Sequence, residues 1–160
     1  MDLTHLSKVY NREQRQQKSP ITNSGISVLL GFDPGKQKCG VAVMGLDRKL
    51  HFQAVIPSQE AIAKVGNLLE SYPISLMVMG DQTASKQWKA ELKSTFPDLR
   101  IITVDERFSS EEARLRFWEI YPAQGLMKLV PLGMRSPDRP IDDIVAIILI
   151  ERYLSRLISS

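Results

Sequence analysis

The sequence predicts an α/β protein with a mixed five-stranded sheet flanked by helices. Residues 26–32 form an apolar run, and two further strand-like segments follow it after short connections, which is typical of an antiparallel meander. The segments after these alternate between helical and strand-like spacing, which favours parallel strands joined by helical crossovers. A chain of 160 residues is long enough to bury the core of one such domain.

The first three strands are expected close together along the chain. Residues 26–32 read ISVLLGF, a nearly continuous apolar run bounded by turn residues, so this strand should be buried on both faces. Residues 41–44 follow after a short loop that contains glycine. Residues 50–56 alternate in polarity and include β-branched and aromatic side chains.

The second half of the chain is expected to alternate helices with strands. Ser58 is expected to cap the first helix, and either Ser109 or Ser110 the helix whose first turn holds Glu111 and Glu112. Four prolines and two glycines interrupt 121–140, which predicts a long loop without regular elements. In order, the predicted segments are a helix at 58–70, a strand at 74–79, a helix at 84–95, a strand at 100–104, a helix from 109 or 110, and a last helix at 141–157.

Composition limits the function classes. Residues 11–19 (NREQRQQKS) lack apolar periodicity, so we expect a disordered or loosely attached basic and polar tail at 1–24 and one domain at 25–160. With Cys39 as the one cysteine, an internal disulfide is excluded and a thiolate zinc site is disfavoured. The longest apolar run has seven residues, against about 20 for a membrane span. We expect a cytoplasmic protein without a membrane partner, and its net charge of +3 fits nucleic acid without requiring it.

Acidic side chains stand at the ends of predicted strands and at the start of the last helix. Because the carboxyl ends of parallel strands meet at one edge of a sheet, these acids are expected to converge there. Clustered carboxylates repel one another unless a cation intervenes, and oxygen ligands suit Mg²⁺ or Mn²⁺. Two such ions can activate water and stabilise the leaving oxygen in phosphodiester hydrolysis. The acids are Asp33, Asp81, Asp105, Glu106, Asp142 and Asp143.

Each acid also has an ordinary structural explanation. Asp33 precedes Pro-Gly and fits a turn, and Asp81 fits a turn or a helix cap. The acids beside Arg107 fit a surface ion pair, while Asp142 and Asp143 suit a helix N-terminus. These explanations leave one pattern unexplained, which is that acids follow three strands and open the last helix.

Three motifs, in the right order, resemble the YqgF/RuvC group of nucleases. Residues 31–43, with GFDPGK and then GVAV, are similar to the opening motif of that group. Residues 104–113 (VDERFSSEEA) are similar to its "DER" motif after a strand. Residues 142–154 (DDIVAIILIERYL) are similar to the closing helix of YqgF proteins. The resemblance covers about residues 26–156.

The resemblance implies an RNase H-like fold and a nuclease that uses Mg²⁺ or Mn²⁺, with two ions expected. For YqgF-like members the implied role is maturation of the 16S ribosomal RNA precursor, and for RuvC-like members it is cleavage of Holliday junctions. The "DER" stretch and the closing helix favour the YqgF side, whereas Asp-Pro-Gly is closer to RuvC. A two-fold symmetric junction as substrate would argue for a homodimer. The alternatives outside this class are a catalytically inactive RNA-binding module and an ATP-binding domain like those of actin-like kinases.

Carried over residue by residue, the resemblance implies a ligand set. Asp33 matches the first metal ligand and Glu106 the acid of the "DER" motif. Asp142 falls at the closing aspartate, with Asp143 as its alternative one residue away. YqgF proteins usually have an apolar-Pro motif after the fourth strand, whereas Asp81 stands here, so it is an additional candidate ligand as in RuvC-like members. Candidate phosphate contacts are Lys36, Lys38, Arg107, Arg135 and Arg139. An ordinary exposed turn explains the two lysines equally well, Arg107 could hold the neighbouring carboxylate instead, and loop arginines such as Arg135 and Arg139 are more often simply solvated.

Overall fold

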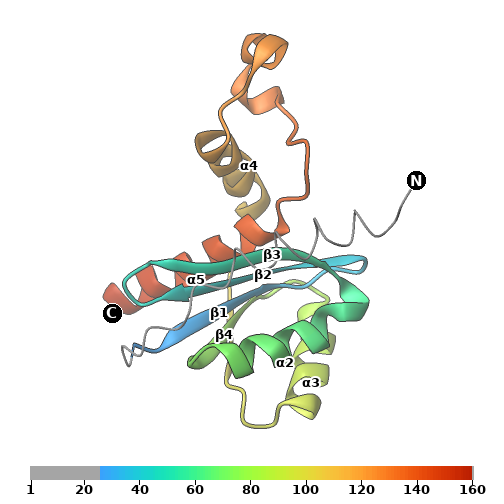
Figure 1. Ribbon diagram of the computed structural model, residues 1–160, viewed down its shortest axis with the longest axis vertical. Coiled ribbons are helices and arrows are strands. Elements are labelled where there is room, and N and C mark those ends of the chain that lie inside the picture. Colours follow the sequence, from blue (N-terminus) through green and yellow to red (C-terminus); the bar gives the residue numbers. More distant parts are fainter. Residues whose placement is uncertain (1–25, 160) are drawn as a thin grey trace, which may run out of the picture.

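In the computed structural model, the central strand of a five-stranded sheet is β1 (Val28–Asp33). It pairs antiparallel with β2 (Lys38–Gly45), which pairs antiparallel with β3 (Leu50–Pro57). On its other side β1 runs parallel to β4 (Ile74–Gly80), and β4 runs parallel to β5 (Ile101–Val104). The order β3-β2-β1-β4-β5 confirms the predicted mixed sheet and the RNase H-like fold (Figure 1).

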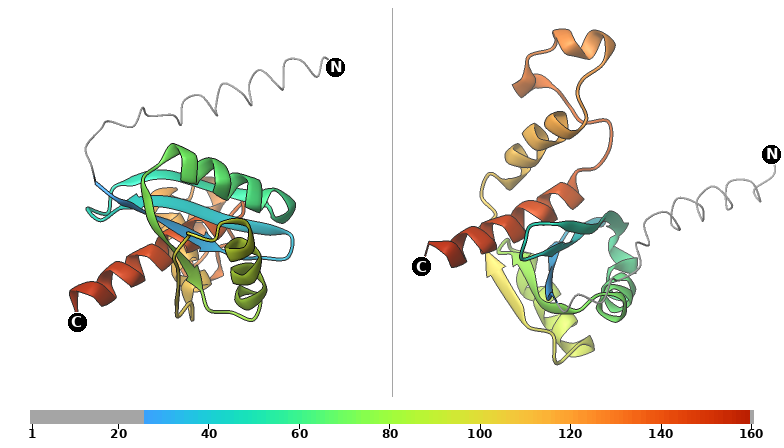
Figure 2. Two further views of the ribbon diagram at one scale, coloured as in Figure 1. Left: turned by 90° about the horizontal axis from the view of Figure 1, so that it is seen from below. Right: turned by 60° about the vertical axis from the view of Figure 1, so that its left-hand side comes forward.

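Helices cover both faces of this sheet (Figure 2). On one face, α2 (Ala61–Ser71) and α3 (Ser85–Thr95) bury apolar side chains against β1 and β4. On the other face, α5 (Asp142–Ile158) packs across β1 and β2. α4 (Ser109–Ile120) packs against α5 and leads away from the sheet.

The continuous apolar run of β1 follows from its place between two helical layers. Leu29 belongs to the core that α5 shares with the sheet, whereas Leu30 belongs to the core under α2 and α3. Gly31 also faces α5, and a Cβ there would collide with the carbonyl oxygen of Ala146 and the side chain of Ile150. The helix can therefore lie unusually close to the centre of the sheet.

The expectation that Ser58 caps a helix is wrong. Ser58 lies in a 3₁₀ turn, η1 (Ser58–Glu60), and α2 begins only after Glu60, which makes no capping side-chain bond. The Ser58 hydroxyl instead donates to the carbonyl oxygen of Gly35 at 2.9 Å. This contact fixes the loop after β1. The Ser58 hydroxyl, which the local sequence pattern predicted to cap a helix, makes a tertiary hydrogen bond instead.

The expectation that Ser109 or Ser110 caps α4 is also wrong. The N-cap is Phe108, in the left-handed conformation at φ 61°, and the helix starts at Ser109 itself. The amide of Ser109 donates to the carbonyl oxygen of Glu106 at 3.0 Å. The helix begins directly out of this tight turn, so Phe108 occupies the N-cap position and both serines lie inside the first turn of α4.

The predicted long loop at 121–140 lacks α-helix and strand, but it is not free of regular structure. It contains two 3₁₀ turns, η2 (Gly125–Leu129) and η3 (Leu132–Met134), which fit between its prolines. Arg135 donates to the carbonyl oxygen of Val130 at 2.8 Å and ties the two turns together. With α4, this loop forms an arm that projects from the sheet (Figure 1).

The structure describes residues 26–159. The predicted tail at 1–24 lies outside these residues, so the domain boundary stays a prediction. None of the helices in the described part of the chain combines the length and the apolar character needed to cross a membrane.

Replacing Ile148 with Ala is expected to lower the free energy of unfolding by about 2–5 kcal/mol, because its side chain is fully buried between α5 and the sheet. Ile158→Ala, at a position of the same helix that is 79% exposed, is expected to change it by less than about 0.5 kcal/mol. Urea unfolding followed by circular dichroism measures both. Equal losses would contradict the packing of α5 described above.

Candidate active site

The candidate site begins with Asp33, the last residue of β1. Because β1 runs parallel to β4 and β5, their carboxyl ends lie at the same edge of the sheet, as the sequence predicts. Asp81 follows β4, and Asp105 and Glu106 follow β5 at this edge. The structure therefore brings the strand-end acids to one region.

The start of α5 reaches this edge because of Gly40. In the β1–β2 pair Gly40 lies directly opposite Asp33. A Cβ on Gly40 would collide with the backbone carbonyl of Asp142, the first residue of α5. The missing side chain thus allows the helix to begin beside the end of β1.

The carboxyl group of Asp33 lies in an unfavourable environment for a negative charge. Burial, followed by the charges of Asp142 and Glu106, raises the pKa of Asp33 from 3.8 to about 8. The three carboxyl groups are therefore electrostatic neighbours. A group of acids that destabilise one another's charged forms at a sheet edge is a candidate functional site.

Glu106 is the most deeply buried of these three acids. It is 4% exposed, and its carboxylate occupies the space that a Cβ on Gly80 would fill. Burial, followed by the charge of Asp81, raises the pKa of Glu106, while a backbone hydrogen bond from Gln82 lowers it. Within the described residues its buried Oε1 has no hydrogen-bond partner. An unpartnered buried oxygen is costly, which suits a site that receives a cation.

The two acids after β5 point in different directions. Asp105 is exposed and forms an ion pair with Arg107 at 2.8 Å. This is the surface pair that the sequence offered as an alternative, and it involves Asp105 rather than Glu106. The Oδ1 of Asp81 accepts the backbone N–H of Glu106 at 3.3 Å, so Asp81 contacts the chain that carries the buried acid.

The two acids at the start of α5 also differ. The charge of Asp142 acts on Asp33. Asp143 is 3% exposed and accepts hydrogen bonds from Arg139 at 3.1 Å and from the amide of Ile144 at 2.9 Å. Asp142 thus belongs to the carboxylate group, whereas Asp143 is held by an arginine of the arm.

The predicted phosphate contacts fall into two classes. Lys36 and Lys38 are exposed in and after the loop that follows Asp33, and the Arg107 side chain is 80% exposed. Arg135 bonds backbone carbonyls of the arm, and Arg139 bonds Asp143 and lies over two aromatic rings. The first three side chains face solvent near the acids, whereas the last two stabilise the arm.

The chemistry of the acids fits a divalent cation, although their present positions do not form a finished cage. Among residues 26–159, no three His, Cys, Asp or Glu side chains are grouped closely enough to hold a metal ion. The donors are nonetheless all oxygens, one of them is buried without a partner, and the Asp33 carboxyl resists ionisation without a compensating charge. A cation between these groups would relieve each of these costs.

Sequence reasoning missed two residues of this region. Gly80 provides the space for the Glu106 carboxylate, and its signal is a glycine at the carboxyl end of a buried strand. Arg152 donates to the carbonyl oxygen of Asp105 at 2.8 Å. Nothing in the sequence shows that an arginine 47 residues away reaches this carbonyl.

Comparison with known proteins gives a family match over most of the chain. Residues 27–156 match the model of a family described as RuvX, Holliday junction resolvase. A Bacteroides thetaiotaomicron protein named "Putative pre-16S rRNA nuclease" is 26% identical over 145 residues, which cover 81% of this chain and 96% of that relative.

Solved structures show more distant similarity. The Thermus thermophilus RuvC structure has a TM-score of 0.48 and 14% identity, covering 81% of this chain and 96% of the other. A "putative sugar kinase" from Cytophaga hutchinsonii has a TM-score of 0.41 and 13% identity over 57% of this chain. The match spans 39% of that kinase structure.

Replacing Asp33 with Asn is expected to stabilise the metal-free protein at pH 8–9 and to change little near pH 4. Between pH 3.8 and about 8 the native Asp33 keeps a proton that the unfolded chain has lost, so its contribution to stability falls as pH rises. The gain at pH 8–9 is expected to be about 1–2 kcal/mol after solvent screening. Urea unfolding in EDTA at several pH values measures it.

The matched control for this experiment is Asp98→Asn, at an exposed acid in the connection between α3 and β5. Its stability should follow the wild-type protein in parallel across the pH range. A parallel curve for Asp33→Asn as well would show that Asp33 is not held in an unfavourable environment.

Proposed function

The chain belongs to the RuvX family, and on that premise we propose that it is a metal-dependent endonuclease that hydrolyses phosphodiester bonds of structured nucleic acid. The observation that carries this proposal is the group formed by Asp33, Glu106 and Asp142 at one edge of the sheet, with a buried carboxylate oxygen of Glu106 that lacks a partner. A structural ion-pair network would pair each acid with a base instead, as Asp143 is paired with Arg139.

In this proposal Asp33, Glu106 and Asp142 hold Mg²⁺ or Mn²⁺. Two such ions, when bound, would supply the chemistry of an activated water and a stabilised leaving oxygen. Burial raises the pKa of the Asp33 and Glu106 carboxyl groups, so binding of a cation would require them to lose protons, and metal affinity is expected to rise with pH. Asp81 and Asp143 act as supports, since one holds the backbone of Glu106 and the other holds Arg139.

Lys36, Lys38 and Arg107 are proposed to contact phosphates on either side of the cut. Each is exposed near the acids, and phosphate contacts position a nucleic acid without reading its sequence. Such contacts make binding weaken steeply as salt rises. Specificity must then come from the shape of the substrate, which fits a structured nucleic acid.

For the substrate we propose the precursor of 16S ribosomal RNA, processed in the cytoplasm. The relative whose name states this substrate matches along 96% of its own length. A four-way DNA junction is the second candidate, because the family description names Holliday junctions. An inactive RNA-binding module would bind these nucleic acids without cutting them.

The first test incubates the protein with precursor 16S RNA, a four-way DNA junction and linear duplexes, each with Mg²⁺, Mn²⁺ or EDTA. We expect metal-dependent cleavage of the RNA and a loss of about 100-fold or more in Asp33→Asn, because the variant removes a metal ligand. Asp98→Asn serves as the matched control and should cleave as the wild type does. Cleavage in EDTA, or cleavage unaffected by Asp33→Asn, would contradict the proposed site.

A second test separates the two acids at the start of α5. Asp142→Asn is expected to reduce cleavage as strongly as Asp33→Asn while leaving the fold intact. Asp143→Asn is expected to retain cleavage within about tenfold and to lose about 1–3 kcal/mol of stability, because Arg139 loses its charged partner. Cleavage rates and urea unfolding, measured on both variants, decide the assignment. The opposite pattern would make Asp143 the ligand.

A further inference from the structure

The peptide unit that joins Asp105 to Glu106 is held from both sides by charged groups. Its carbonyl oxygen accepts a hydrogen bond from the guanidinium of Arg152 on α5 at 2.8 Å. Its N–H donates to the carboxylate of Asp81, which follows β4, at 3.3 Å. The unit therefore lies between an arginine of the last helix and an aspartate at the sheet edge.

The two bonds act on one rigid plane. Because a peptide unit is planar, fixing its oxygen and its N–H also fixes the direction in which the Glu106 backbone leaves it. The positive guanidinium of Arg152 bonds the oxygen, which is the negative end of the peptide dipole, and the negative carboxylate of Asp81 bonds the N–H, which is the positive end. Each bond therefore polarises the peptide unit and strengthens the other bond. The freedom that remains to Glu106 lies mainly in its own side chain, in the space above Gly80.

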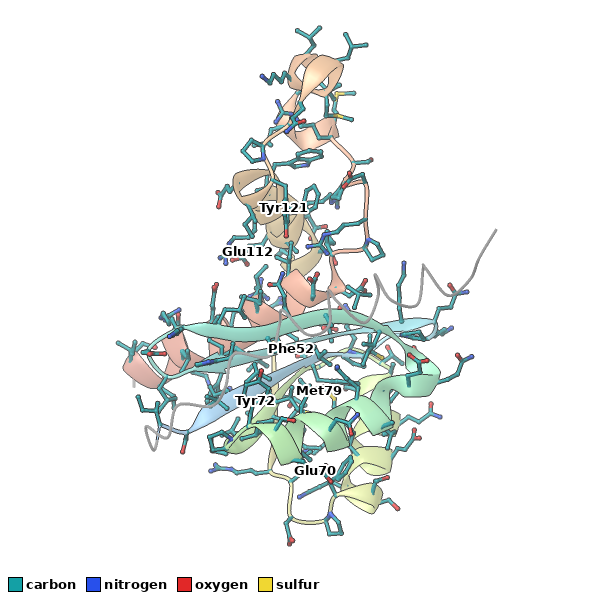
Figure 3. The ribbon with its side chains drawn as sticks, viewed as in Figure 1. Phe52, Glu70, Tyr72, Met79, Glu112 and Tyr121 are labelled. Carbon is teal, nitrogen blue, oxygen red and sulfur yellow. The ribbon has the colours of Figure 1, made fainter. Side chains whose placement is uncertain are left out.

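Arg152 also joins α5 to the arm, but it does not do so alone. It donates to Glu112 of α4 at 3.0 Å, and Figure 3 shows Glu112 at the base of the arm. Arg116 of α4 donates two bonds of 2.9 Å to Glu151 of α5. Two arginine–glutamate pairs thus connect the same two helices, and of these arginines Arg152 is the one that also bonds the backbone beside Glu106.

We propose that Arg152 is a positioning residue for the cluster of three acids formed by Asp33, Glu106 and Asp142. It holds the Asp105–Glu106 peptide against Asp81, so that the Glu106 carboxylate stays at the sheet edge within reach of a cation. This inference rests on the proposed function, because it assigns Arg152 to the same site. Asp105 is exposed, so its carbonyl oxygen can bond water when Arg152 is lost, and we expect variants of Arg152 to fold.

The test compares Mn²⁺ affinity, measured by calorimetry, in the wild type, Arg152→Met and Arg116→Met. Both variants remove one of the two pairs between α4 and α5, and both are expected to remain folded with similar losses of stability. We expect Arg152→Met to weaken Mn²⁺ binding about 10- to 100-fold and Arg116→Met to change it by less than about twofold. Arg116→Met is the matched control for the loss of an interhelical ion pair.

Two milder variants separate the bonds of Arg152. Glu112→Gln removes the charged partner of Arg152 on the arm but keeps the bond from Arg152 to the Asp105 carbonyl oxygen. Mn²⁺ affinity in this variant should therefore stay within about twofold of wild type. Arg152→Lys keeps the positive charge but lacks the guanidinium fork, so its affinity should fall between those of wild type and Arg152→Met. These variants decide the matter even where Arg152→Met does not fold.

The outcomes are distinguishable. Wild-type affinity in Arg152→Lys and Arg152→Met would overturn the positioning role and leave the proposed nuclease intact. An equal loss in Arg116→Met would show that Arg152 acts through the helix pair, which also overturns it. Absence of Mn²⁺ binding to the wild type would instead overturn the proposed function, and the positioning role with it.

Discussion

The close contact between the start of α5 and the end of β1 governs the candidate site. Asp33 ends the central strand, and Gly40, its partner on β2, has no side chain to keep the helix away. Any larger residue in place of Gly40 would push the first turn of α5 off the sheet and increase the distance between Asp142 and Asp33. The seven consecutive buried apolar residues 144–150 hold the helix against the sheet, so the packing of the core sets the spacing of the acids.

This arrangement opposes stability, because it brings negative charge together where water is scarce. The raised pKa values of Asp33 and Glu106 are consequences of that conflict, and the unpartnered oxygen of Glu106 adds to it. The apolar layers on both faces of the sheet offset the cost, since each fully buried Leu or Ile contributes roughly 1.5–3 kcal/mol. Carboxyl groups with strongly raised pKa values are concentrated at functional sites, and a cation would relieve the charge conflict at this one.

The fold was predictable from the sequence because strand and helix periodicity, together with short or helical connections, leave few topologies. The fine structure of the site was not. Asp142 and Asp143 are neighbours in one helical turn, and which of them faces Asp33 depends on how α5 crosses the sheet. Phe108 caps α4 because a tight turn follows β5, and no local serine signal reveals that turn. Glu106 rather than Asp105 was expected from the resemblance to the "DER" motif, and the structure buries Glu106 while it leaves Asp105 exposed.

One helix positions acids that arrive from two different parts of the chain. α5 supplies Asp142 in its first turn, and ten residues later, about 15 Å along its axis, it supplies Arg152, which bonds the peptide before Glu106. A shift of α5 along the sheet therefore moves Asp142 directly and Glu106 through Arg152, while Asp33 stays fixed in the central strand. The distance between the acids therefore depends on how one rigid helix, α5, packs on the sheet. The arm is attached to this helix through the ion pairs of Glu112 and Arg116, so a movement of the arm would also act on α5.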